Sequence, residues 1–166
     1  MKENESIFKR LGPLFFGLWI VTTILLVGLF LMGRMSFSSL EDGRRVVEVS
    51  ASDKVLILTE MRELLFALNR MHGALAVGDQ QAAADAAESV GMGMVESLAE
   101  REASLIAKLP IEMKKLGFST HENFDDIAKK LRENPGMDQR AISAEIKTLT
   151  DKCVACHAAY RIEATY

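Results

Sequence analysis

From residue 50 onward, apolar side chains recur every three or four positions, and short breaks rich in glycine, proline and polar residues separate these stretches. Such spacing indicates helices with one buried face, whereas alternation in twos would indicate strands. Ala, Leu, Met, Glu and Lys are abundant and long β-branched runs are few, which also favours helix over strand. The sequence therefore predicts an all-α protein.

The first amphipathic helix is expected over residues 51–77. Ser50 and Asp53 form an S-x-x-D capping signal at its start, and Gly78 is a natural stop. The seam predicted to face the interior consists of Leu58, Met61, Leu65, Leu68, His72 and Leu75.

The second helical pattern begins after Asp79, a good N-cap, and runs to about Leu109, where Pro110 ends it. Gly91 and Gly93 lie in its middle, and each glycine costs up to ~1 kcal/mol relative to alanine inside a helix. A bend or a break is therefore expected near these glycines.

Two further helices complete the pattern. The third is expected to begin at the S-x-x-E capping box of Ser119 and Glu122 and to end at Asn134-Pro135-Gly136. Its predicted buried residues are Phe124, Ile127, Ala128 and Leu131. The fourth opens near Asp138 and carries a seam of Ile142, Ile146, Leu149, Cys153, Cys156 and Tyr160. Four amphipathic helices joined by short loops predict an antiparallel four-helix bundle over residues 51–166.

An uncharged apolar stretch, Leu14–Met32, precedes the bundle. A helix of this length spans ~28 Å, close to the thickness of a bilayer core. The positive residues before it also fit a signal peptide, but the stretch is longer than a usual signal core and no A-x-A-like site follows it. The sequence thus favours an N-terminal segment (1–13), one transmembrane anchor (14–33) and a tether (34–50).

Charge and cysteine usage exclude several classes of protein. The net charge is −3 and no basic patch is apparent, so nucleic acid is not expected as a partner. The two cysteines lie three positions apart near the end of the chain, which argues against a disulfide framework. No nucleophile–base pair is visible, and we do not expect an enzyme.

The chemistry is concentrated in Cys153-Val154-Ala155-Cys156-His157, a C-x-x-C-H motif typical of covalent c-type haem attachment. On a helix, Cys153 and Cys156 share one face, where two thiols can add to the two vinyl groups of a porphyrin. His157 can then bind the iron. Two alternatives stay open: a zinc site, which lacks an obvious fourth ligand, and a thioredoxin-like redox pair, which lacks a βαβ setting.

The same motif continues as His157-Ala158-Ala159-Tyr160-Arg161, and it resembles the C-x-x-C-H-x-x-Tyr-Arg ending of class II cytochromes c, the cytochrome c′ group. This resemblance implies a four-helix bundle with one covalent haem c near the C-terminus. It also implies maturation outside the cytoplasmic membrane, hence a cytoplasmic N-terminus, a single-pass anchor in a bacterial inner membrane and a haem domain in the periplasm. The added anchor, the long second helix and the Gly91–Met94 stretch depart from the family.

Other residues are candidates around the iron. Met61, on the seam of the first helix, is the predicted sixth ligand, although a methionine on an apolar face is often core filler. His72 and His121 are weaker candidates, and His121 is expected at the surface or as a cap. Arg161 could pair with a haem propionate or could be a solvated arginine in the last helical turn.

These observations predict a membrane-anchored electron carrier that transfers one electron at a time. Its expected partners are the lipid bilayer and redox proteins, either a membrane complex or other cytochromes, with a homodimer as a further expectation. The alternatives are a five-coordinate haem module that binds or senses small gases, and a haem subunit of a larger membrane complex.

Overall fold

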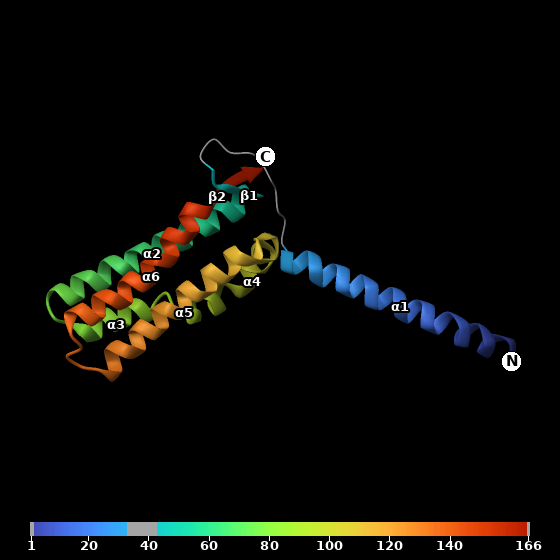
Figure 1. The fold of residues 1–166 in the computed structure, drawn as a ribbon, viewed down its shortest axis with the longest axis horizontal. Coiled ribbons are helices and arrows are strands. Elements are labelled where there is room, and N and C mark those ends of the chain that lie inside the picture. Colours follow the sequence, from blue (N-terminus) through green and yellow to red (C-terminus); the bar gives the residue numbers. More distant parts are fainter. Residues whose placement is uncertain (1, 33–42, 166) are drawn as a thin grey trace.

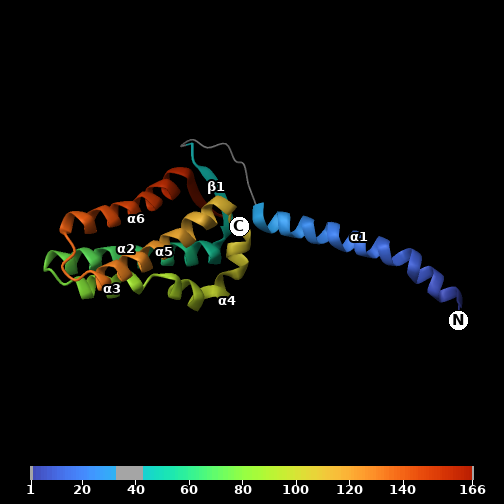
Figure 2. The same ribbon diagram turned by 60° about the horizontal axis from the view of Figure 1, so that its bottom comes forward.

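We describe the protein from a computed structural model that covers residues 2–32 and 43–165. Most of the chain is helical, as predicted. The elements in chain order are α1 (Lys2–Met32), β1 (Arg45–Ser50), α2 (Ala51–Ala76), α3 (Gln80–Glu88), α4 (Met92–Lys108), α5 (Ile111–Glu133), α6 (Gln139–Ala159) and β2 (Tyr160–Thr165). Figures 1 and 2 show α2 to α6 packed together and α1 pointing away from them.

The expectation of an all-α chain is wrong at two short segments. Strands β1 and β2 pair in parallel, from Arg45 opposite Tyr160 to Ser50 opposite Thr165. The predicted tether therefore ends in a strand, while residues 34–42 of that tether, and residue 33 of the predicted anchor, lie outside the described residues. Likewise, α6 ends at Ala159, so Tyr160 and Arg161 belong to β2 and not to a last helical turn. A pairing across more than a hundred residues leaves no local signal in either segment.

Helix α2 has nearly the predicted bounds, and the Ser50 hydroxyl accepts a hydrogen bond from the Asp53 amide at 3.1 Å. Leu75 is buried as predicted, and Met61 and Leu68 are partly buried, but the rest of the buried seam is shifted by one residue from the predicted one. Ile57, Leu64 and Met71 are buried, while their neighbours Leu58, Leu65 and His72 are exposed. The two rows lie side by side on the helix and both are largely apolar, so only the tertiary partners decide which row faces inward.

The expected interruption near the glycines is confirmed, because α3 ends at Glu88 and α4 begins at Met92. The carboxylate of Asp125, in α5, accepts a hydrogen bond from the Met92 amide at 2.8 Å and so satisfies a free donor at the start of α4. Gly91 lies against this carboxylate so closely that a Cβ atom at residue 91 would overlap it. The hydrogen bond from Met92 to Asp125 thus fixes the break between α3 and α4 against α5.

The third predicted helix begins too late. Helix α5 starts at Ile111, directly after Pro110, and the Ser119 hydroxyl donates to the Leu116 carbonyl within the helix instead of capping its start. A proline that ends one helix can immediately precede the next. The S-x-x-E pattern of Ser119 and Glu122 predicts a helix start, but here it lies inside a helix. The predicted start of the last helix is confirmed, since Asp138 caps α6.

The interior consists of two apolar clusters. In the larger one, α3 lies against both α2 and α5 and contributes four buried alanines, whose small side chains allow close approach. These are Ala83, Ala84, Ala86 and Ala87. The smaller cluster lies beside the strands and is formed by Val47, Val49, Ile57, Leu105 and Tyr160. Ile57 and Leu105 of the smaller cluster also line a pocket, which is described below.

Helix α1 contains a stretch, Gly12–Leu29, that is long and apolar enough to cross a membrane, with a mean hydropathy of 2.0 and no buried residue. This finding agrees with the predicted anchor in its coarse features. Length and composition of this kind occur both in single-pass anchors and in signal sequences.

The contact between Gly91 and Asp125 generates a prediction. Gly91→Ala should destabilise the full-length protein in detergent by about 1–3 kcal/mol, because the new Cβ displaces Asp125 from the Met92 amide. Gly93→Ala is the matched control, since nothing lies within 4 Å of a Cβ at that position. It should be neutral or stabilising by up to ~1 kcal/mol. Thermal unfolding followed by circular dichroism measures both, and equal midpoints for the two variants would contradict the assigned contact.

Candidate functional site

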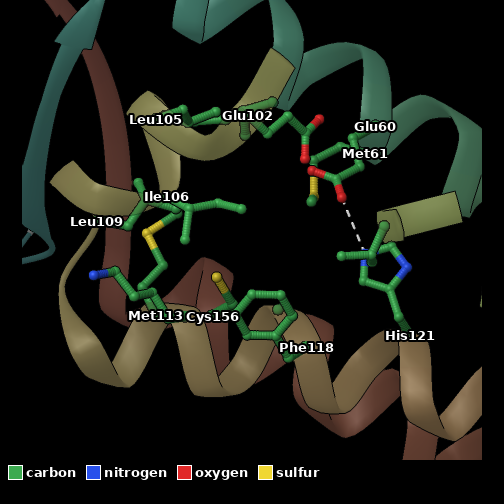
Figure 3. A pocket seen from close by; sticks show the side chains of 14 residues that line it. Glu60, Met61, Glu102, Leu105, Ile106, Leu109, Met113, Phe118, His121 and Cys156 are labelled. Atoms are coloured by element: carbon green, nitrogen blue, oxygen red, sulfur yellow. Dashed lines mark hydrogen bonds and ion pairs between the residues drawn. The ribbon is translucent and has the colours of Figure 1, made fainter. Parts of the chain in front are cut away.

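A pocket opens where α2, α4, α5 and α6 meet, with about 640 Å³ of space outside the protein atoms, part of it open to solvent (Figure 3). Most lining side chains are apolar, and a few polar ones converge on the same space. The lining residues that carry the argument below are Glu60, Met61, Glu102, Lys114, His121 and Cys156.

The two cysteines lie in the last turns of α6, one helical turn apart. Both thiols are half-buried and free, and the Cys156 side chain lines the pocket. Burial raises the pKa of both thiols, and the neighbouring Cys153 raises that of Cys156 further. Cys153 lies next to the Leu149 carbonyl, at 4.0 Å from sulfur to oxygen. One thiol of the C-x-x-C-H motif therefore faces a cavity, and the other lies on the same face of the helix.

Met61 lies in the same pocket, on the opposite side from Cys156 (Figure 3). It is partly buried and packs against both apolar clusters, so its thioether lies where the two parts of the interior meet. The structure therefore brings together two of the sequence-predicted site residues that are distant along the chain. Met61 as an iron ligand stays a prediction.

His157 and Arg161 are not among the residues that line the pocket. His157 is exposed in the last turn of α6. The Arg161 guanidinium forms an ion pair with Glu163, at 2.8 Å, and its Nε atom is buried without a hydrogen-bond partner among the described residues. Tyr160, the preceding residue, is buried in the smaller cluster, so Arg161 projects from the other face of the strand. Their roles toward a haem stay predictions.

The histidines differ from expectation. His72, which was predicted to lie on the inward seam of α2, is exposed on the outer face of that helix. His121, expected at the surface, is only 3% exposed. Its Nδ1 lies 2.7 Å from the Val90 carbonyl and its Nε2 lies 3.0 Å from Glu60 Oε1. A carbonyl oxygen only accepts, so Nδ1 carries a proton and donates it to Val90.

Two carboxyl groups and a lysine give the pocket its electrostatic character. Burial raises the pKa of Glu102, and the charge of Glu60 raises it further. Burial alone would lower the pKa of His121, but its hydrogen bonds to Glu60 and Val90 and the charges of both glutamates outweigh this and raise it. Burial also lowers the pKa of Lys114. Buried ionisable groups at a cavity are typical of functional sites.

Sequence reasoning missed the role of Glu60, Glu102 and Lys114 and placed His121 wrongly at the surface, although a signal was present. His121 lies three positions before Phe124 and continues the seam of α5 that also contains Ala128 and Leu131. Glu102 lies three positions before Leu105 on the buried face of α4. A polar residue that occupies a seam position is a candidate for a buried hydrogen-bonded role.

Comparison of the chain with known protein families, with characterised proteins and with solved structures found no match. Within residues 2–32 and 43–165, no group of three or more His, Cys, Asp and Glu side chains is placed to hold a metal ion.

The raised pKa of His121 predicts a pH dependence of stability. The stabilisation by its protonated form is fully present below the ordinary pKa of 6.5 and is lost as pH rises through the raised value of the folded protein. The raised pKa of Glu102 acts in the same direction, from its ordinary value of 4.5 upward. The temperature of the unfolding midpoint should therefore decrease as the pH rises above about 6.5.

Glu60→Gln should reduce this pH dependence of the unfolding midpoint, because the variant lacks the carboxylate that raises the pKa values of His121 and Glu102. Glu100→Gln, at an exposed position of the same pocket-forming region, should keep the wild-type slope. Thermal unfolding across the pH range measures the three proteins. Identical slopes for wild type and Glu60→Gln would contradict the assigned pairing.

Proposed function

We propose that this protein is a membrane-anchored c-type cytochrome that carries single electrons. One observation carries the proposal: Cys156 of the C-x-x-C-H motif lines a largely apolar pocket to which Met61, from the distant helix α2, also contributes. A motif that matched by chance would have no reason to face a largely apolar pocket.

The residues present fit a haem. Cys153 and Cys156 would hold it through two thioether bonds, with His157 as the proximal ligand and Met61 as the distal ligand. The haem, when bound, supplies the one-electron chemistry, and the protein supplies ligation and burial. Ile57, Leu105 and Phe118 line the pocket with apolar side chains that would pack against the haem. Lys114, in the same wall, and Arg161, with its unpaired Nε, supply positive charge suited to propionates.

The fold and location of the protein form part of the same proposal. We infer a four-helix arrangement of the class II cytochrome kind in which α3 and α4 together take the place of the second helix. Helix α1 would anchor the protein in a bacterial inner membrane, with the haem domain in the periplasm. Tethering of this kind suits electron exchange with membrane complexes or other cytochromes.

A second candidate function is the binding of small gases at a five-coordinate iron. The carboxyl group of Glu102 at the pocket favours it, since it could hydrogen bond to a small polar ligand. The choice between the two candidates depends on whether Met61 binds the iron.

The first test concerns attachment. The full-length protein, produced in a bacterium that matures c-type cytochromes, should carry one haem that resists acid–acetone extraction and adds its mass to the polypeptide. The double variant Cys153→Ala, Cys156→Ala should carry none, because both thioether bonds are lost. A wild-type polypeptide without the added mass would overturn the proposal.

The second test concerns Met61. Met61→Ala should remove the weak far-red methionine–iron band, change the spin state and lower the reduction potential, because a thioether favours ferrous iron. Met71→Ala is the matched control, since Met71 is fully buried in the larger cluster and does not line the pocket. It should cost about 2–5 kcal/mol of stability and leave the spectrum unchanged. A wild-type protein that is already high-spin and binds carbon monoxide would favour the gas-binding candidate.

A further inference from the structure

His121 links three segments of the chain through one buried side chain. It lies in α5, donates from Nδ1 to the Val90 carbonyl at 2.7 Å and meets Glu60 Oε1 through Nε2 at 3.0 Å (Figure 3). Val90 lies where α3 gives way to α4, and Glu60 directly precedes Met61 in α2. The imidazole therefore connects α5 to the turn of α2 that carries Met61 and to the corner before α4.

The contact with Glu60 constrains how α2 is rotated about its own axis. Glu60 and Met61 are successive residues, so a rotation that moved the Glu60 carboxylate off Nε2 would also swing Met61 away from its place in the pocket. Methionine has three rotatable bonds and packs adaptably, so its own contacts fix it poorly. A rigid polar contact at the preceding residue compensates for that freedom.

We propose that His121 is a positioning residue that keeps the Met61 thioether directed into the pocket, acting through Glu60. The inference rests on the proposed function, in which Met61 is the distal iron ligand. It goes beyond that function because it assigns a role to a side chain that touches neither the cysteines nor the iron.

Other contacts make this role separable from general stability. Helix α4 is also held by the Asp125 carboxylate at Met92, and near its other end by the ion pair of Lys108 with Asp53, at 2.8 Å. The larger apolar cluster, which does not include His121, holds α2 against α3 and α5. Replacement of His121 should therefore leave the helices assembled and should mainly change the position of the Met61 side chain.

The test uses the full-length haem-loaded protein in detergent, with His121→Phe as the main variant and His72→Phe as the matched control at an exposed position. The readouts are haem mass, the far-red methionine–iron band, carbon monoxide affinity of the reduced protein and the unfolding midpoint. His121→Phe should keep its haem, weaken the band and bind carbon monoxide about tenfold more tightly, because a larger fraction of molecules has an open distal site. His72→Phe should match the wild type.

Two variants at Glu60 keep the inference falsifiable if His121→Phe does not fold. Glu60→Ala removes the same link from the α2 side and should reproduce the loss of the band. Glu60→Gln retains an amide that can hydrogen bond to Nε2 and should retain most of the band.

The outcomes separate this inference from the function it rests on. Unchanged band and carbon monoxide affinity in His121→Phe and Glu60→Ala, with only a lower unfolding midpoint, would reduce His121 to a structural residue. A Met61→Ala spectrum equal to that of the wild type would overturn the inference but leave the covalent haem in place. A wild-type protein without covalent haem would overturn the proposed function itself.

Discussion

The direction of α4 depends on hydrogen bonds that two side chains of α5 form with the turn from Val90 to Met92. Asp125 satisfies the Met92 amide, His121 donates to the Val90 carbonyl, and Gly91 leaves room for the carboxylate between them. Gly91 and Gly93 already weaken a continuous helix here, and these contacts hold the turn in place. With them, the chain breaks after α3, and α4 follows its own path along the far half of α5. The pocket lies in the space that this change of direction leaves.

The two ends of the helical assembly are therefore packed differently. Four alanines of α3 allow close contact with α2 and α5, and this end is filled like an ordinary protein interior. At the other end, α4 packs less extensively against its neighbours, and its apolar side chains line a cavity. Apolar walls around open space favour a large apolar occupant, which is the physical argument for the proposed haem.

The pocket also shows how a polar network can coexist with an apolar site. His121 has a partner at each ring nitrogen, so its burial leaves no unsatisfied ring atom. Glu102, by contrast, faces the cavity with a raised pKa, because burial and the nearby Glu60 both disfavour its charge. The polar groups lie on the α2–α4–α5 side, and the cysteine pair enters from α6. This separation keeps the carboxyl groups away from the motif that would hold the cofactor.

The sequence by itself determined the helical class, the bounds of α2, the break near Gly91, the cap of α6 and the C-x-x-C-H motif. Each of these depends on local chemistry: helical periodicity, glycine and proline preferences, or the spacing of two thiols. Tertiary structure alone decided which of two adjacent apolar rows of α2 faces inward, that β1 pairs with β2, and that Met61, Cys156 and His121 share one pocket. These outcomes depend on contacts between segments far apart in the chain, where the partners, and not the local pattern, set the free energy.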